Sequence, residues 1–324
     1  MLLVTGGAGF IGSNIVAALN DAGRTDVVVC DLLGDAGKWR NLARRQLADI
    51  VPPGELIAWL DGRKCEAVIH MGAISETTAT DGDLVIETNF RFSLRLLDWC
   101  AAHAVPFIYA SSAATYGNGE QGFDDDPAAL TALRPMNLYG WSKHLFDMAV
   151  IERAALGDKL PPQWAGLKFF NVFGPNEYHK GAMMSVLARR FDDIKSGRTV
   201  ELFKSHRDGI ADGDQRRDFI YVDDVVRVVM WLLATPQVSG LFNVGTGKAR
   251  SFKDLMLAAY AALEAKPNIR YIDMPESIRN SYQYFTQSEA DRLRRAGYNG
   301  GFTPLEEAVG LYVRNYLDSA DRYR

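Results

Sequence analysis

The first half of the chain repeats short, wholly apolar runs that alternate with longer stretches of helical periodicity. Runs of this length and composition are typical of strands buried on both faces of a parallel sheet. We expect strands at residues 2–4, 27–30, near 49–50, 67–70 and 106–110. We expect the intervening helices at residues 11–19 and 83–103 and from about residue 137. This alternation predicts an α/β fold with a doubly wound parallel sheet.

The expected helix at 83–103 has a stripe of apolar residues that Asn89 interrupts: Leu84, Ile86, Leu94, Leu97 and Cys100. The second half of the chain is less regular. We expect strands at 168–172, returning to the main sheet, and at 199–203 and 218–222. Helices are expected at 183–195, 223–233, 251–263 and 303–317. Their predicted caps are Asp223, Ser251 and Thr303, with Pro304 in a first turn.

The bulk properties exclude several classes of protein. The 324 residues carry a formal net charge of −4, and the basic clusters 40–45 and 292–295 fit solvated helix faces, so we expect no nucleic-acid partner. No apolar stretch approaches the roughly 20 residues that span a bilayer, so we expect no membrane contact. The first expected strand begins at residue 2 and leaves no room for a signal peptide. Three cysteines without metal-ligand spacing fit buried thiols in a cytoplasmic protein that holds no metal.

A glycine loop, Gly6-Gly7-Ala8-Gly9-Phe10-Ile11-Gly12, joins the first expected strand to the first helix. Strand, glycine loop and helix in this order are the context that a dinucleotide-binding motif requires. Glycine permits a tight turn and lets the backbone approach a pyrophosphate, while the helix directs its unpaired N–H groups at the phosphates. The loop therefore predicts a nucleotide site at the start of the sheet.

Asp31 follows the second expected strand, at the distance from the glycines where an acid commonly binds the adenosine ribose. It could instead cap a helix or a turn. Lys38 and Arg40 follow closely and could meet a 2′-phosphate, so these residues leave NAD and NADP open. His70 closes a buried strand, where a histidine is more often structural than a catalytic base.

A second cluster of candidate chemistry lies farther along. Tyr139 and Lys143 are four residues apart on one expected helix and share a face. An ammonium beside a phenol is expected to lower the pKa of the tyrosine, which could then exchange a proton with a sugar hydroxyl beside a nicotinamide. Ser112 ends a strand, where open α/β sheets bind ligands, and could orient that hydroxyl. Tyr and Lys are also ordinary helix-surface residues; the order of loop, serine and helix favours the functional interpretation.

With these motifs the chain resembles the extended short-chain dehydrogenases/reductases that modify nucleotide sugars. The matching stretches are GGAGFIG (6–12), SSAATYG (111–117), YGWSK (139–143), FFNVFGP (169–175), RDFIYVDDV (217–225) and FNVGTG (242–247). The resemblance implies a Rossmann domain and a smaller C-terminal α/β lobe that binds a nucleoside diphosphate sugar. We expect the Rossmann domain at 1–170 and mainly the lobe at 171–324, with about 217–250 returning to the Rossmann side.

Within this family, the chain is similar to the branch that inverts carbon 6 of an ADP-linked heptose. The similar stretches are residues 1–21, 110–117, 170–186 and 281–287. Dehydratases of the family carry an Asp-Glu pair where this chain has Ala113 and Ala114, so we exclude that activity. Lys180, in the His179-Lys180-Gly181 stretch, resembles the second acid/base of the heptose branch, although it could be an exposed loop lysine.

The resemblance implies a role for each matching position. Tyr139 and Lys180 would be the acid/bases, assisted by Lys143 and Ser112. The cofactor, NADP by resemblance with NAD possible, would contact Gly6, Gly9, Phe10, Ile11, Gly12, Asp31, Leu32, Lys38, Met71, Gly72, Ala73, Ile74, Ser75, Asn89, Lys143, Val172 and Lys180. The ADP-heptose would contact Asn171, Ala182, Arg189, Phe203, Lys204, Ser205, His206, Arg217 and Tyr282. An Arg suits a diphosphate because a guanidinium can donate to two oxygens at once. The resemblance also suggests a homo-oligomer, a pentamer.

Some positions depart from the heptose pattern, which has Glu, Ser, His and Arg where this chain has Met71, Ala182, Arg189 and Ser281. The stretch 207–215 is also longer than in that pattern. Two alternatives stay open. A 4-epimerase or reductase of another nucleotide sugar would keep Tyr139 and Lys143 but would not need Lys180. A nucleotide sensor without catalysis would be expected to lose the Tyr/Lys pair, which this chain retains.

Overall fold

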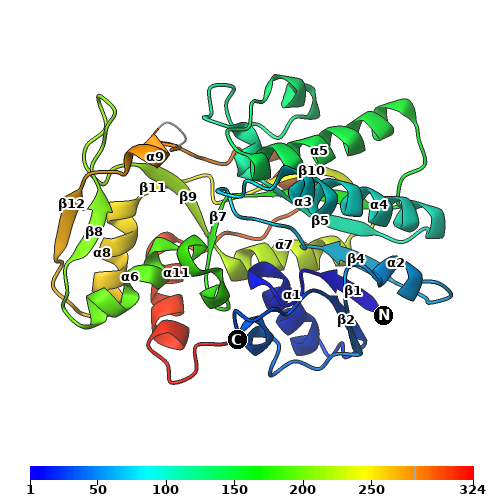
Figure 1. The fold of residues 1–324 in the computed structure, drawn as a ribbon, viewed down its shortest axis with the longest axis horizontal. Helices are drawn as coiled ribbons and strands as arrows, with labels where there is room; N and C mark the ends of the chain where they lie inside the picture. Colours follow the sequence, from blue (N-terminus) through cyan, green and yellow to red (C-terminus); the bar gives the residue numbers. More distant parts are fainter. Residues whose placement is uncertain (280–281) are drawn as a thin grey trace.

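A seven-stranded parallel sheet in the order β10-β6-β5-β4-β1-β2-β3 forms the centre of the larger part of the protein (Figure 1). The computed structural model describes residues 1–279 and 282–324. The strands of this sheet are β1 (Leu2–Thr5), β2 (Val27–Cys30), β3 (Asp49–Val51), β4 (Ala67–His70), β5 (Phe107–Ser112), β6 (Trp164–Phe169) and β10 (Gly240–Val244). Thr5 is in register with both Cys30 and His70, so the strands end at one common edge.

Helices cover both faces of this sheet, which confirms the doubly wound fold. On one face α1 (Phe10–Asp21) and α7 (Val222–Ala234) bury Ile15 and Val229 against the strands. On the other, α4 (Phe92–His103) and α5 (Leu138–Leu156) bury Leu97 and Phe146. Figure 1 shows these pairs of helices on opposite sides of the strands. The remaining helices around the sheet are η1 (Lys38–Asn41), α2 (Leu56–Trp59), α3 (Gly82–Ile86), η2 (Glu87–Arg91), η3 (Ala113–Tyr116), η4 (Pro127–Ala132) and α10 (Asp291–Arg295).

A smaller lobe is built from later segments around a separate core, which includes Phe191, Leu255 and Val309. Its strands are β7 (Asn171–Phe173), β9 (Arg216–Tyr221) and β11 (Ala249–Ser251) in one sheet, and β8 (Val200–Phe203) with β12 (Ile269–Ile272) in another. Its helices are η5 (Tyr178–Met183), α6 (Val186–Lys195), α8 (Phe252–Ala262), α9 (Glu276–Arg279), α11 (Leu305–Tyr312) and η6 (Val313–Leu317). This agrees with the expected α/β lobe.

The prediction of one strand over 168–172 is wrong. β6 ends at Phe169, and β7 begins at Asn171 and pairs with β9 of the other sheet. The change of sheet occurs at Phe170, whose N–H still donates to Val244 O at 3.1 Å. Sequence pattern alone did not reveal it, because the run is apolar on both sides of the change.

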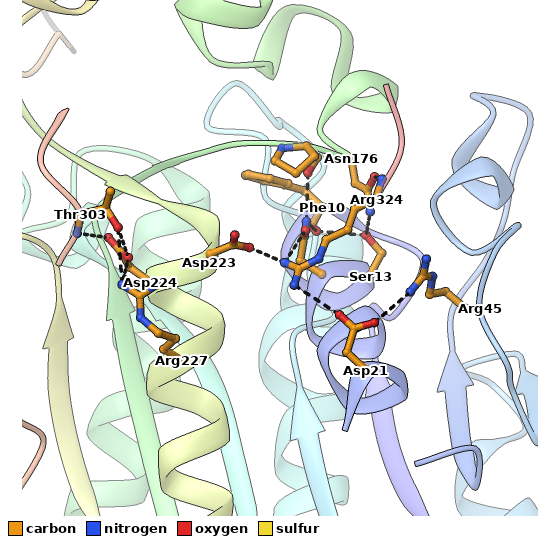
Figure 2. Close-up of polar contacts among 12 residues, drawn as sticks. Phe10, Ser13, Asp21, Arg45, Asn176, Asp223, Asp224, Arg227, Thr303 and Arg324 are labelled. Carbon is orange, nitrogen blue, oxygen red and sulfur yellow. Dashed lines mark hydrogen bonds and ion pairs between the residues drawn. The ribbon is translucent and has the colours of Figure 1, made fainter. Parts of the chain in front are cut away.

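Two predicted caps are also wrong. Helix α7 begins at Val222 after Tyr221, so Asp223 lies in its first turn rather than at its N-cap. Thr303 does not cap α11, whose N-cap is Pro304. Instead, the Thr303 hydroxyl donates to Asp224 Oδ1 at 2.7 Å, a contact visible in Figure 2. The predicted Ser251 cap is present, as a full capping box with Asp254.

The apolar stripe predicted for 83–103 is wrong at its start. A π-turn, η2, contains Asn89 and separates α3 from α4. Its extra residue per turn rotates the buried face. Leu84 is therefore 53% exposed, while Val85 and Leu97 are buried.

Within residues 1–279 and 282–324, no helix combines the length and apolarity needed to cross a membrane.

Candidate active site

The glycine loop forms a cradle in which side chains would collide with backbone. Gly6 has a φ of +63°, and an added Cβ there would lie 2.6 Å from Gly72 N. At Gly12 an added Cβ would lie 2.2 Å from Gly6 O. Gly9 is the N-cap of α1 and offers no side chain to the N–H groups of the first turn. These N–H groups and the positive end of the helix dipole fit a pyrophosphate.

Asp31 lies beside this cradle, at the end of β2. Its carboxylate accepts from Ala8 N at 2.9 Å and from Leu32 N at 2.8 Å. It also pairs with Lys38 Nζ at 2.6 Å. The Arg40 guanidinium lies instead over the ring of its neighbour Trp39, 5.8 Å from the centroid. Of the two basic candidates, Lys38 is therefore the one that joins Asp31.

Asn89 connects the loop 71–75, which follows β4, to the helix that carries Tyr139. Its side-chain amide accepts from Ile74 N at 2.8 Å and donates to Ile74 O at 2.9 Å. It also donates to Ser142 Oγ at 2.9 Å, and Ser142 donates to Tyr139 O at 2.7 Å. The fully buried Asn89 thus fixes the loop 71–75 relative to the first turn of α5.

Ser112, Tyr139 and Lys143 come together where β5 ends and α5 begins. Asn137 caps α5 by accepting from Gly140 N at 2.8 Å. Burial raises the pKa of Tyr139, which hydrogen bonding with Ser112 opposes. The expectation of a lowered tyrosine pKa is therefore wrong for the protein alone. Burial also lowers the pKa of Lys143 to about 8, so the arrangement holds a neutral phenol beside an easily deprotonated ammonium.

A buried ion pair behind this cluster was not predicted from the sequence. Lys168 Nζ lies 2.7 Å from Asp147 Oδ2, and both side chains are fully buried. Asp147 also accepts from Ser111 Oγ at 2.6 Å, and Lys168 donates to Thr115 Oγ1 at 2.8 Å. The available signal was position, because Asp147 lies one further helical turn beyond Lys143 on the same face of α5. Its carboxylate raises the pKa of Lys143 against the effect of burial.

Lys180 lies in η5, and its ammonium is 5.6 Å from the centroid of the Phe10 ring. Phe10 is the first residue of α1, directly after the glycine cradle. Lys180 is half-buried rather than a fully exposed loop lysine. Burial lowers its pKa, and the nearby Glu177 carboxylate opposes that shift. The structure thus brings the predicted second acid/base to the predicted phosphate site.

In the smaller lobe, Arg217 lies between aromatic rings. Its guanidinium is 5.2 Å from the centroid of Tyr282 and 5.6 Å from that of Phe252. Tyr282 in turn packs edge-to-face on Phe203. Burial lowers the pKa of Arg217. A buried guanidinium beside aromatic faces can bind an anionic, ring-bearing group such as a nucleoside diphosphate.

The other predicted substrate residues divide by location. Ala182 and Arg189 line a pocket of about 770 Å³ next to η5. Lys204 pairs with Asp273 at 3.4 Å, and the Ser205 hydroxyl donates to Arg207 O at 3.0 Å, so both side chains are engaged within their own surface region. Placements of the rest are as follows: Asn171 opens β7 beside Val172, His206 Nε2 accepts from Met274 N at 3.2 Å, and Ser281 lies outside the described residues.

His70 is structural, as its position favoured. It is buried, with its two ring nitrogens 2.6 Å from Thr5 Oγ1 and 2.8 Å from Ser93 Oγ. Burial lowers its pKa to about 3. Thr5 Oγ1 also accepts a hydrogen bond from Gly72 N at 3.1 Å. Through Thr5, His70 therefore helps to position the loop 71–75.

The family model described as the NAD dependent epimerase/dehydratase family matches residues 2–245. The chain belongs to this family. A relative in Nitratidesulfovibrio vulgaris (strain DP4), ADP-L-glycero-D-manno-heptose-6-epimerase, is 48% identical over 327 residues and is covered completely, as is this chain. A relative of the same name in Fusobacterium nucleatum is 44% identical over 335 residues, again with complete coverage of both chains.

Solved structures agree with the epimerase/dehydratase fold. The crystal structure of Helicobacter pylori ADP-L-glycero-D-manno-heptose-6-epimerase superposes with a TM-score of 0.82 at 27% identity, covering 98% of this chain and 96% of that one. Members of the epimerase/dehydratase family use a nicotinamide cofactor, and this chain has the features to hold one. They are the glycine cradle, the α1 N-terminus without a side-chain cap, and the buried Lys143.

Proposed function

We propose that this protein inverts carbon 6 of the heptose in ADP-D-glycero-D-manno-heptose and yields the L-glycero epimer, a precursor of the lipopolysaccharide core. The observation that carries the proposal is the 48% identity, over the full length of both chains, to an enzyme of that name. Lys180 lies beside Phe10, next to the expected cofactor site. This location supports the proposal, because the inversion needs a second acid/base in addition to Tyr139.

The chemistry follows from where carbon 6 lies. The glycine cradle and the N-terminus of α1 would hold a nicotinamide cofactor, which would supply reversible hydride transfer at carbon 6 and so give access to a 6-keto form of the sugar. Carbon 6 is outside the pyranose ring, so rotation about one bond turns the opposite face of the ketone toward the same site. The hydroxyl oxygen then points in a different direction, and one phenol cannot serve both orientations. Tyr139 is the acid/base for one orientation and Lys180 for the other.

Each remaining residue has a supporting role. Ser112, at the end of β5, orients the reacting oxygen toward Tyr139. The Lys143 ammonium has no hydrogen-bond partner among the described side chains, and it would donate to the ribose of the cofactor. Arg217 and Tyr282 would hold the diphosphate and nucleoside between the two lobes. We divide the lobes mainly at residues 170 and 171, with α7, β10 and α10 returning to the side of the main sheet.

The cofactor we propose is NADP. Asp31 alone would repel a 2′-phosphate, but the Lys38 ammonium 2.6 Å away compensates its charge and adds a cation at the ribose end of the site. NAD would need only the ribose contact with Asp31. The ion pair is therefore the feature that favours the phosphorylated cofactor.

The proposal is tested by incubating the protein with ADP-D-glycero-D-manno-heptose, without added nicotinamide, and following the configuration at carbon 6 by NMR. We expect full conversion to an equilibrium of epimers with no net change in reduced-nicotinamide absorbance. Accumulation of reduced nicotinamide would indicate a dehydrogenase instead.

The variant Lys180→Met distinguishes the proposed 6-epimerase activity from family activities that do not need a second acid/base. Loss of a general acid/base typically lowers turnover by about 10²–10⁴. We expect a loss of that size while the cofactor stays bound. The matched control is Lys253→Met, because Lys253 is exposed on α8 and has no side-chain partner among the described residues. Near-native turnover of Lys180→Met would leave Tyr139 as the sole acid/base, as in a 4-epimerase or reductase.

A further inference from the structure

The loop that carries Lys180 is fixed by two buried residues that precede it. Glu177 is 1% exposed and accepts from Ser185 Oγ at 2.8 Å and from Tyr312 OH at 3.1 Å, which ties the loop to α6 and α11. Asn176 is fully buried with a φ of +72°, a conformation that its surroundings must hold in place. Its side chain donates to Ser13 Oγ on α1 at 3.0 Å.

The end of the sequence, residues 318–324, contacts the same loop at two points just before Lys180. Arg324 N donates to Asn176 Oδ1 at 3.0 Å. Tyr178 OH donates to Arg322 O at 2.8 Å, and the Tyr178 ring packs edge-to-face on Tyr323 at 5.3 Å. Figure 1 shows the C-terminal end lying beside α1, far from it in sequence.

The Arg324 side chain anchors this segment to the larger part of the protein. Its guanidinium pairs with Asp223 in the first turn of α7 and lies 3.7 Å from Asp21 at the end of α1. It also donates to Asn14 Oδ1 at 3.4 Å. Figure 2 shows the guanidinium between the two carboxylates, with Asn176 on its other side. Only 20% of the Arg324 side chain is exposed, so these contacts are partly shielded from solvent.

Further contacts extend the segment across the smaller lobe. Arg322 pairs with Asp192 on α6 at 3.1 Å, and Lys195 pairs with Asp318 at 2.5 Å. Residues 320–323 also form one wall of the pocket of about 770 Å³ whose other wall includes Ala182 and Arg189. The segment is thus joined to α1, α7, α6 and the Lys180 loop at once.

We propose that Arg324 is a positioning residue, through which the segment 318–324 holds the Lys180 loop against α1. Its contribution to catalysis rests on the proposed role of Lys180, whereas its effect on the loop does not. A displacement of a reacting group by about 1 Å can cost on the order of 10²-fold in rate, so a loosened loop is expected to lower kcat.

The first test needs no substrate. Hydrogen exchange of the full-length protein is measured over residues 176–185 in the wild type and in Arg324→Ala. We expect faster exchange in this peptide in the variant, partly restored in Arg324→Lys, because the loop opens locally when its anchor is removed. The matched control is Arg314→Ala, an exposed arginine without a hydrogen bond or ion pair among the described residues. Unchanged exchange over 176–185 in Arg324→Ala would overturn the proposal, whatever the substrate.

The second test asks whether the effect acts through Lys180. We expect Arg324→Ala to lower kcat by at least ten-fold with a smaller change in KM. In a Lys180→Met background the same substitution is expected to change residual turnover by less than about two-fold, because the group it positions is absent. An equal loss in both backgrounds would contradict positioning of Lys180. Tyr178→Phe, which removes the hydrogen bond to Arg322 O and the contact of the hydroxyl with Tyr312, is expected to give a smaller loss in the same direction.

Discussion

The ion pair between Asp147 and Lys168 is the most enclosed charge interaction around the candidate site. Both side chains are fully buried. Asp147 also accepts from the hydroxyls of Ser111 and Tyr109, and Lys168 donates to the hydroxyl of Thr115. Such a pair adds little to stability compared with apolar side chains in its place, but removing one partner leaves the other charge buried and uncompensated. The pair lies on α5 and β6, the two elements that meet behind Tyr139.

Asp147→Asn is therefore expected to lower the free energy of unfolding by about 3–5 kcal/mol, because Lys168 would lose its counter-charge. Urea unfolding measures the change. The control is Asp98→Asn, since Asp98 is 58% exposed in its pair with Arg153 and such surface pairs contribute at most about 1 kcal/mol. Equal losses in the two variants would contradict the importance of burial here.

At the end of β2, Lys38 decides between the two cofactors in our proposal. Lys38→Ala leaves Asp31 uncompensated beside the 2′-phosphate, so NADP binding is expected to weaken at least ten-fold more than NAD binding. Fluorescence titration of cofactor-free protein measures both affinities. Equal weakening, or a native preference for NAD, would reject NADP as the cofactor.

The sequence predicted which residues form the candidate site better than it predicted the directions of their pKa shifts. The spacing of Tyr139 and Lys143 placed both on one face of α5, but the predicted direction of the Tyr139 pKa shift was wrong. Burial, which spacing does not contain, raises this pKa more than the hydrogen bond with Ser112 lowers it, and the Asp147 carboxylate also raises it. Asp147 and Lys168 escaped prediction because the contact joins a helix to a strand, and each residue alone resembles an ordinary surface charge.

Among the elements, α5 approaches the strand end that carries Ser112 unusually closely. An added Cβ at Gly140 would lie 2.6 Å from Ala114 O in η3. Gly140 follows Tyr139, so this contact sets how near the phenol comes to Ser112. A glycine inside a helix costs about 1 kcal/mol relative to alanine, and close packing is the compensating gain here.

Gly140→Ala is therefore expected to lower turnover at least ten-fold and to destabilise by about 1–3 kcal/mol despite its better helix propensity. The measurements are steady-state kinetics and urea unfolding. Gly82→Ala in the first turn of α3 is the control, since nothing lies within 4 Å of its added Cβ and its stability is expected to stay equal or rise. A neutral or stabilising Gly140→Ala would mean that α5 can move without consequence.

The pattern of apolar positions predicted most strands of the main sheet, because each is a short run between turn residues. It was wrong at 168–172, where the apolar run continues while the chain changes sheets at Phe170. It was also wrong at Leu84, since one π-turn around Asn89 shifts the phase of the helix. Both errors arise from local backbone changes that leave no trace in hydrophobicity.

On the scale of the whole molecule, the common edge of the main sheet and the smaller lobe bring distant residues together. The glycine cradle, Ser112 and the loop 71–75 all follow strands of one parallel sheet, and this grouping could be predicted from strand order. The Lys180 loop is different. Arg324, Asn14 and Asn41, which lie far from this loop in sequence, help to hold it in place. For example, Asn41 Nδ2 donates to Asn176 O at 3.1 Å. No local sequence pattern predicts such contacts.

The central claim is that the hydrogen on carbon 6 leaves and returns within one site while two protein groups exchange the hydroxyl proton. It is tested most directly with ADP-D-glycero-D-manno-heptose deuterated at carbon 6. We predict that the L-glycero product retains the deuterium at carbon 6, in ordinary water and without added nicotinamide, and that Lys180→Met and Tyr139→Phe each abolish most of the conversion. Replacement of the deuterium by solvent hydrogen, or no conversion of this substrate by the wild-type protein, would contradict the account.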